Sequence, residues 1–203
     1  MAEFTVLSNF GVRYFLMPFA TGSAAVSGTI VLSADGKSLG AAAQVLPTTA
    51  ELEDVLSCSI GEVSKDVKTF RTLNSDGWES AVSLGQALSE GSMSLIRTGT
   101  GNPYVGAAAG STYNALRKWM ADAAATGGSN APKAIIEIVP RGGSSYEGTI
   151  YRCVPTNFDP GERNTSDGQE YSISVQPFGC PISVVPTASS TSGQAFTISN
   201  PSA

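Results

Sequence analysis

The fold of this chain is decided by residues 68–99, KTFRTLNSDGWESAVSLGQALSEGSMSLIRTG, which begin and end with the pattern of a β-strand. A hairpin connection usually needs about two to five residues. Here residues 73–90, mostly small, polar or glycine, separate a strand expected at 62–72 from a partner strand expected at 92–97. Connections of that length are uncommon unless they serve a function. We therefore predict a long functional loop at residues 73–90.

Length and composition set the first limits. The chain has 203 residues, a formal net charge of −5 and 14% charged residues, whereas soluble domains carry about 25%. This length predicts one domain, and the negative charge argues against the basic surface of a nucleic-acid-binding protein. The shortage of charge fits either a surface rich in Ser, Thr and Gly or large buried contacts between subunits.

The residues needed for common catalytic chemistry are missing. The chain contains no histidine, so it lacks the commonest general base and cannot form a Ser-His-Asp or Cys-His arrangement. Its three cysteines are far apart in the sequence and fit reduced, mostly buried thiols better than a disulfide framework. We therefore expect no catalytic residue, no metal site and no cofactor, and a protein that is not an enzyme.

One group of carboxylates needs separate consideration. Glu51, Glu53 and Asp54 follow a Pro-Thr-Thr-Ala segment. They could be imagined as a metal site, but we interpret them as solvated residues in the first turn of a short helix, where they favour the helix dipole. No apolar run approaches the ~20 residues of a membrane helix, so we expect a soluble protein with no membrane partner.

The pattern of apolar residues predicts β-strands and one helix. Strands are expected at 28–33, 134–139, 146–155 and 170–177, and the short polar connections between the last three predict an antiparallel sheet. The helix is expected at 111–125, where apolar residues recur at helical spacing. We expect one face of it to pack on a sheet, and that face comprises Tyr113, Leu116, Trp119 and Met120.

The two ends of the chain differ from its middle. Residues 181–203 are rich in Ser, Thr and Pro and carry no charged side chain, so we predict an extended C-terminal arm there, although residues 195–199 could pair as a strand. The first 60 or so residues alternate apolar runs with Gly, Ser and Ala, and we expect them to be partly arm-like. The main domain is therefore expected at residues 1–180.

In their order, these parts resemble the tail tube (major tail) proteins of long-tailed phages. The resemblance covers about residues 62–181, and the order of the segments carries it more than any single motif. The matching segments are 69–78 (TFRTLNSDGW), 91–97 (GSMSLIR), 114–119 (NALRKW), 135–139 (IIEIV), 148–151 (GTIY) and 170–177 (EYSISVQP), with Gly-Cys-Pro after the last.

The resemblance implies an antiparallel β-sandwich or barrel with one flanking helix. Copies form hexameric rings whose inner sheets join into one barrel, and the rings stack into a tube that conducts viral DNA. It also implies contacts with a tail terminator, with tip or baseplate proteins and with a tape measure protein, whereas DNA is only in transit. The location is the tail of the virion, after assembly in the host cytoplasm.

The resemblance gives the long loop a role, because the corresponding loop reaches from one ring to the next. Trp78 and Leu84 are expected to be its apolar anchors, since buried aromatics dominate interface energetics. The alternative is that Trp78 folds back onto its own sheet. The predicted inter-ring contacts are Leu73, Asn74, Asp76, Trp78, Leu84 and Gln86.

The negative charge also gains a role, because an acidic lumen repels the phosphate backbone and lets DNA slide. Asp66, Glu147 and Glu170 lie in or beside the expected inner strands, so they are our candidates for the lumen. A solvated outer face is the alternative for each, since a register error of one residue reverses the assignment.

Three other functions stay open at this stage. The inner tube of a contractile tail or injection device shares the expected architecture. A β-sandwich module that binds carbohydrate or a cell surface would instead be a monomer with exposed aromatics clustered on one face. The missing histidine argues against a hydrolase with paired carboxylates without excluding it, and no pair in the sequence is favoured for that role.

Overall fold

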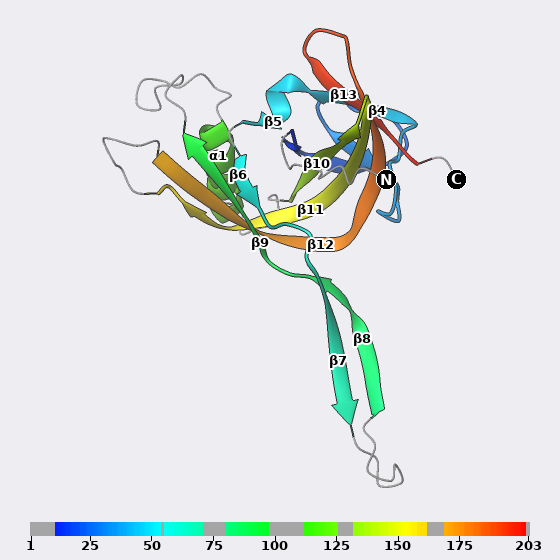
Figure 1. Cartoon of the computed structure of the whole chain (residues 1–203), viewed down its shortest axis with the longest axis vertical. Coiled ribbons are helices and arrows are strands. Elements are labelled where there is room, and N and C mark those ends of the chain that lie inside the picture. The colour runs from blue at the N-terminus through cyan, green and yellow to red at the C-terminus, as the bar shows by residue number, and fades with distance from the viewer. Residues whose placement is uncertain are drawn as a thin grey trace, which may run out of the picture.

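The structure is a computed structural model that describes residues 11–53, 55–70, 80–97, 112–125, 132–161 and 169–201. Most of these residues lie in β-strands, the large sheet is antiparallel, and one helix packs beside it (Figure 1). The predicted fold class, mainly β with an antiparallel sheet and one flanking helix, is confirmed. No helix in this described part of the chain has the length and apolarity needed to span a membrane.

The largest sheet has nine strands in the order β4-β13-β12-β11-β10-β1-β5, with β9 paired to β12 and β6 paired to β9. Its strands are β1 (Arg13–Met17), β4 (Ala43–Pro47), β5 (Glu51–Leu52), β6 (Val55–Cys58), β9 (Gly91–Arg97), β10 (Lys133–Gly142), β11 (Ser145–Asp159), β12 (Gln169–Ala188) and β13 (Gln194–Ser199). Two smaller sheets pair β2 (Phe19–Thr21) with β3 (Ile30–Leu32), and β7 (Val63–Phe70) with β8 (Ser80–Leu88). The helix α1 is Thr112–Ala125, and one turn of 3-10 helix occupies Thr48–Ala50.

The centre of the large sheet is buried on both faces. Successive side chains of a strand point to opposite faces, and along β1 Phe15 and Met17 belong to one hydrophobic cluster whereas Leu16 packs against another. In the neighbouring β10, Ile136 and Ile135 are divided in the same way. We call the first cluster the strand core and the second the helix core.

The strand core lies between the centre of the sheet and strands β3, β4 and β13. Leu32, Leu46 and Ile198 from these three strands are completely buried in it. Phe15 and Phe196 meet edge to face, with ring centroids 6.0 Å apart, which is a favoured geometry for aromatic pairs. Each apolar side chain of this size stabilises the fold by about 1.5–3 kcal/mol when it is fully buried.

The helix core lies between the sheet and α1. Leu116 and Trp119 are completely buried in one cluster with apolar side chains of β9 and β12. Tyr113 is partly buried and packs against the same cluster. Met120 is only half-buried, and the helix instead places Ala123 among its buried residues.

The longest strand, β12, belongs to both cores. Its first half places Ile173 in the helix core, and its second half places Ile182 in the strand core. Ile173 and Ile182 are nine residues apart, so alternation along the strand places them on opposite faces, and between them residues 179–181 stand opposite the single residue Tyr151 of β11. Gly179 has a φ of +69° there, which glycine adopts without strain. Bulges of this kind bend a strand and redirect its side chains.

Both ends of the described chain contribute to the sheet, which corrects two predictions. The arm expected at 181–203 is wrong, because residues 181–188 continue β12 and β13 pairs with both β12 and β4. Phe196 of β13 is buried in the strand core. Residues 11–58 likewise supply β1 to β6 and are not arm-like, whereas residues 1–10 lie outside the described part.

Candidate assembly surfaces

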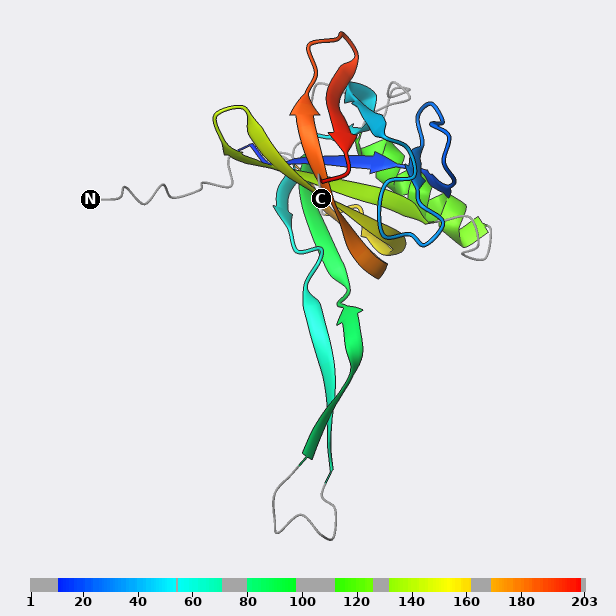
Figure 2. The same ribbon diagram turned by 90° about the vertical axis from the view of Figure 1, so that its right-hand side faces the viewer.

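A two-stranded hairpin projects from the body of the molecule (Figures 1 and 2). Strands β7 and β8 pair antiparallel, from Val63 opposite Leu88 to Phe70 opposite Ser80. Residues 71–79, which join the two strands, lie outside the described residues. The hairpin includes much of the segment for which the sequence predicts a loop.

Two expectations for this segment are therefore wrong. Residues 80–88 form strand β8 and not loop, and β7 pairs with β8, whereas β9 pairs with β12 and β6. The sequence hides β8 because this strand combines Ala, Ser and Gly85 with few large apolar residues, and glycine weakens a strand pattern. Of the predicted inter-ring residues, Leu84 and Gln86 belong to β8, and Leu73, Asn74, Asp76 and Trp78 lie outside the described residues.

The hairpin is joined to the body at its base. The N–H of Ser89 donates to the carbonyl of Glu62 at 3.0 Å, which closes the base of the hairpin, and the side-chain amide of Gln176 in β12 donates to the carbonyl of Leu88 at 3.0 Å, which ties this base to the body. Beyond this base, β7 and β8 form a sheet with no third strand among the described residues. Such a hairpin is marginally stable in water by itself, and both of its edges are open to another chain.

The second surface is the face of β6, β9, β12 and β11 that points away from the helix core. Short polar side chains form two rows across these strands, and we call the two rows the serine face. Neighbours in a row stand directly opposite in the register, so they lie on the same side of the sheet. No lysine or arginine occupies either row. One row is Ser57, Ser94, Ser172 and Asp159, and the other is Ser92, Ser174 and Asn157.

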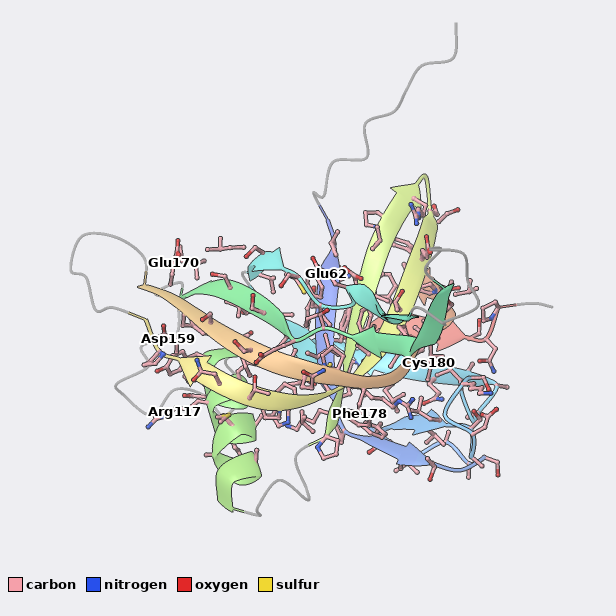
Figure 3. The ribbon with its side chains drawn as sticks, turned by 90° about the horizontal axis from the view of Figure 1, so that it is seen from below. Glu62, Arg117, Asp159, Glu170, Phe178 and Cys180 are labelled. Atoms are coloured by element: carbon pink, nitrogen blue, oxygen red, sulfur yellow. The ribbon has the colours of Figure 1, made fainter. Side chains whose placement is uncertain are left out.

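The predicted lumen carboxylates do not gather in one place. Glu170 is exposed and lies on the serine face by the alternation of β12, at the same end as Asp159 (Figure 3). Glu147 is exposed in the β10–β11 hairpin, where it forms an ion pair with Arg141. Asp66 belongs to β7, and its side chain is outside the described part of the structure.

Sequence reasoning missed the serine face and the position of Asp159. The signal is the alternation Ser92-Met-Ser94, repeated as Ser172-Ile-Ser174, with apolar residues between the serines. Alternation of this kind shows that each strand has one polar face. It does not show which strands are neighbours, and the neighbours decide whether the polar faces join into one surface.

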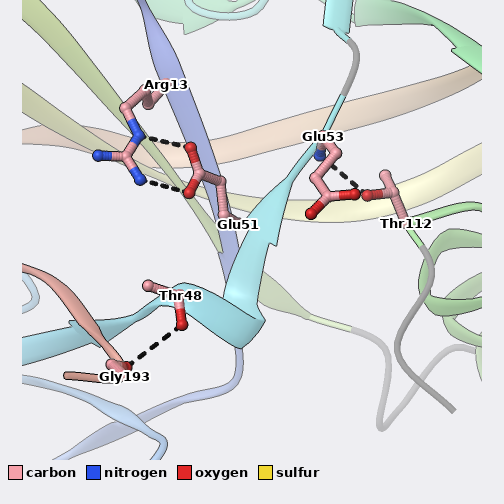
Figure 4. Close-up of polar contacts among 6 residues, drawn as sticks. All are labelled: Arg13, Thr48, Glu51, Glu53, Thr112 and Gly193. Carbon is pink, nitrogen blue, oxygen red and sulfur yellow. Dashed lines mark hydrogen bonds and ion pairs between the residues drawn. The ribbon is translucent and has the colours of Figure 1, made fainter. Parts of the chain in front are cut away.

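Glu51 and Glu53 contribute contacts within the fold (Figure 4), whereas Asp54 lies outside the described residues. Glu51 lies in β5 and forms an ion pair with Arg13 of β1, and the hydrogen bond from the guanidinium to Glu51 raises the pKa of Arg13. The N–H of Glu53 donates to Thr112 Oγ1 at 2.9 Å, which ties the start of α1 to the sheet. Their interpretation as a first helical turn is wrong, because the 3-10 turn ends before Glu51. Within the described residues, no three His, Cys, Asp or Glu side chains gather as a metal site.

Shifted pKa values occur in the helix core. The hydroxyls of Tyr14 and Tyr151 donate to the two carboxylate oxygens of Glu137, at 3.1 and 3.4 Å. Burial raises the pKa of Tyr151 to about 12 and that of Cys153 to about 12. Shifted pKa values occur in buried structural networks as well as in catalytic sites. Here Cys153 lies in the helix core, and Tyr14 and Tyr151 pack against it, so burial in the fold accounts for the shifts.

Comparisons with known proteins give a limited result. No protein-family model and no curated protein matches the chain. A chain in the cryo-EM structure of the anti-feeding prophage (AFP) baseplate is similar at 6% identity and a TM-score of 0.45, over 65% of this chain and 79% of that chain. A chain in the virion of the native gene transfer agent (GTA) particle is similar at 12% identity and a TM-score of 0.45, over 65% and 85%. Similarity at this level does not indicate a shared function.

Proposed function

We propose that this chain is the structural subunit of the tail tube of a long-tailed phage. Its copies form hexameric rings, and the rings stack into a hollow tube that conducts viral DNA into the host. The observation that carries this proposal is the β7–β8 hairpin, which leaves the body as two strands with both edges open. A hairpin of this kind gains stability by contacting another chain, and a stacked ring supplies that chain.

The serine face suits the wall of a DNA channel. Its two rows carry hydroxyl, amide and carboxylate groups and no cation, and Glu170 adds negative charge at the same end as Asp159 (Figure 3). A basic wall binds the phosphate backbone strongly, whereas an acidic wall repels it. We therefore propose that the serine face, with Glu170, lines the lumen.

The partners follow from this role. Contacts that close by rotation make the ring, and contacts that do not close make the stack, so the main partner is another copy of the chain. A tail terminator, tip or baseplate proteins and a tape measure protein complete the tail, and DNA only passes through. The subunit acts in the tail of the virion after assembly in the host cytoplasm, and it performs no catalysis.

The competing functions find less support. An inner tube of a contractile tail or injection device would use the same two surfaces, and no contact described above distinguishes it. A module that binds carbohydrate or a cell surface would present clustered aromatics. Among the described side chains, Phe178 is the one aromatic that is exposed, so no aromatic platform supports that function.

The test removes the end of the hairpin without disturbing its strands. Phe70 and Ser80 are register partners, so a two-residue Asn-Gly turn can replace residues 71–79 and close the hairpin. We expect the wild-type protein to form hollow tubes or stacked rings, seen by negative-stain microscopy and by sedimentation. The shortened variant should stay folded, with an unchanged thermal midpoint, and should form no tubes.

The control introduces the same Asn-Gly turn into another hairpin without shortening that hairpin. In the β10–β11 turn, Asn-Gly replaces Gly143 and Ser144, which lie between the register partners Gly142 and Ser145. This control variant should form tubes as the wild type does. A shortened variant that still forms tubes would contradict the role of the hairpin. A wild-type protein that stays monomeric at every concentration would contradict the proposed function, and glycan binding by that monomer would favour the binding module.

A further inference from the structure

An open groove lies beside β4. It is formed by residues 25–29 and β4, together with Thr49 and Gln194, and it has a volume of about 560 Å³. No charged residue lines it. We call it the β4 groove. An uncharged groove of this size is suited to apolar or small polar side chains rather than to an ion.

The groove offers both apolar surface and an unpaired strand edge. Val26 and Val45 line it and are 53% and 41% exposed, which places them among the most exposed large apolar residues of the described chain. Strand β4 stands at the end of the strand order, so its outer edge has no partner strand among the described residues. An open edge beside apolar pockets is the arrangement that binds an extended segment through its backbone.

The wall of the groove is held rigidly. Gln44 of β4 is 6% exposed, and its side-chain amide accepts a hydrogen bond from the N–H of Val31 and donates one to the carbonyl of Val31, each at 2.6 Å. These two hydrogen bonds fix β4 against β3. A preformed groove loses little conformational entropy when it binds a ligand.

The arrangement of the molecule indicates what fills the groove. Strands β4 and β13 lie at the end of the body away from the β7–β8 hairpin in both views (Figures 1 and 2). The segment 71–79 at the far end of that hairpin contains Leu73 and Trp78. A projection at one end and an uncharged groove at the other allow copies to join head to tail, and such contacts build a filament when they do not close.

We propose that the β4 groove receives the end of the β7–β8 hairpin of a second copy. The apolar side chains of residues 71–79 pack against Val26 and Val45, and hairpin backbone lies along the open edge of β4. This inference rests on the proposed function and adds the receptor for the hairpin on the neighbouring ring.

Covalent capture tests this contact directly. Cys180 is exposed, contrary to the expectation of mostly buried thiols, whereas Cys58 is half-buried and Cys153 is buried. In a Cys180→Ser background, the pair Val45→Cys and Trp78→Cys gives each copy one thiol at each end. Oxidation should then produce a ladder of covalent multimers on a non-reducing gel, and neither single variant should produce a ladder.

A control pair places the first thiol elsewhere. Leu56 of β6 is 53% exposed and does not line the groove, so Leu56→Cys with Trp78→Cys should give no ladder. As a second measurement, Val45→Asp should lower the mass of tubes at least about tenfold, equivalent to about 1.4 kcal/mol of contact free energy. Leu56→Asp should not lower it in this way. If Val45→Asp also lowers the thermal midpoint, the loss of tubes no longer tests the contact, and the covalent ladder decides whether the groove binds the hairpin.

The outcomes separate the two proposals. Suppose that the wild type forms tubes but the Val45 pair gives no ladder, or the Leu56 pair gives an equal ladder. This result contradicts binding of the hairpin in the β4 groove and leaves the proposed function standing. A ladder from the Val45 pair without tubes supports the groove and overturns the tube. A wild-type protein with neither tubes nor a ladder overturns both.

Discussion

The hydrogen bonds between Gln44 and Val31 allow a quantitative prediction for Gln44→Leu. Leucine is similar in size to glutamine, so the substitution removes two hydrogen bonds without opening a large cavity. The N–H of Val31, a residue that is 2% exposed, then loses its side-chain partner, whereas the Val31 carbonyl loses one bond and keeps the one from the Gly40 N–H at 2.9 Å. One unpaired buried group costs about 1–3 kcal/mol, so the free energy of unfolding should fall by about 1–3 kcal/mol.

Urea and thermal unfolding, followed by circular dichroism, measure this loss. For a chain of this size, a loss of about 2 kcal/mol lowers the thermal midpoint by about 4–8 °C. The control is Gln194→Leu, because Gln194 is half-buried and accepts only a long bond, 3.4 Å, from the hydroxyl of Ser189. The control should lose less than about 1 kcal/mol. Equal losses in Gln44→Leu and Gln194→Leu would refute the reasoning.

Three further predictions concern the helix core and the serine face. Trp119 is completely buried, so Trp119→Ala should lower the free energy of unfolding by about 3–5 kcal/mol in a urea titration, and a loss below about 1 kcal/mol would contradict its place in the core. Because burial raises the pKa of Tyr151 and of Cys153 to about 12, from ordinary values of 10.0 and 9.0, the folded chain keeps protons that the unfolded chain releases. The contribution of these two groups to the free energy of unfolding should therefore be complete below pH 9 and fall as the pH rises toward 12. A urea midpoint that stays constant over this range would contradict the burial of the two groups. If the serine face lines the lumen, Ser172→Lys should yield tubes that retain DNA in a salt-dependent manner, as measured by co-sedimentation. Tubes that retain no DNA would indicate that another face lines the lumen.

Local patterns predicted the elements that lie at the centre of the fold. The apolar run at 134–139 became β10, and the alternating residues at 170–177 became the first half of β12. The helix expected at 111–125 is present at Thr112–Ala125. In each case, most of the side chains that set the pattern are buried in the cores, so the local signal and the tertiary packing agree.

The errors arose where pairing rather than local pattern decides the structure. The residues of β8 are small and include Gly85, so only the presence of β7 alongside makes them a strand. In the C-terminal segment, the absence of charge suggested an arm, but the alternating Phe196 and Ile198 pack in the strand core. Composition alone cannot distinguish an uncharged arm from an uncharged strand whose partners are far away in the sequence.

The candidate site shows the same limit. Glu147 and Glu170 were equivalent candidates in the sequence, yet Glu147 pairs with Arg141 whereas Glu170 lies on the serine face. The assignment depends on the register, because a shift of one residue moves a side chain to the other face. The serine face itself requires four strands in register, and no single strand contains that information.

The bend in β12 connects the two proposed surfaces. The first half of this strand carries Ser172 and Ser174 of the serine face, and its second half pairs with β13, which in turn pairs with β4 beside the groove. At the bend, a Cβ at Gly179 would overlap the Arg152 guanidinium, so the side chain of Arg152 occupies space that only glycine leaves free. Because both cores pack on this strand, the groove cannot tilt without moving the serine face. If a hairpin of the next ring seats in the groove, that contact therefore also sets the orientation of the face that lines the channel.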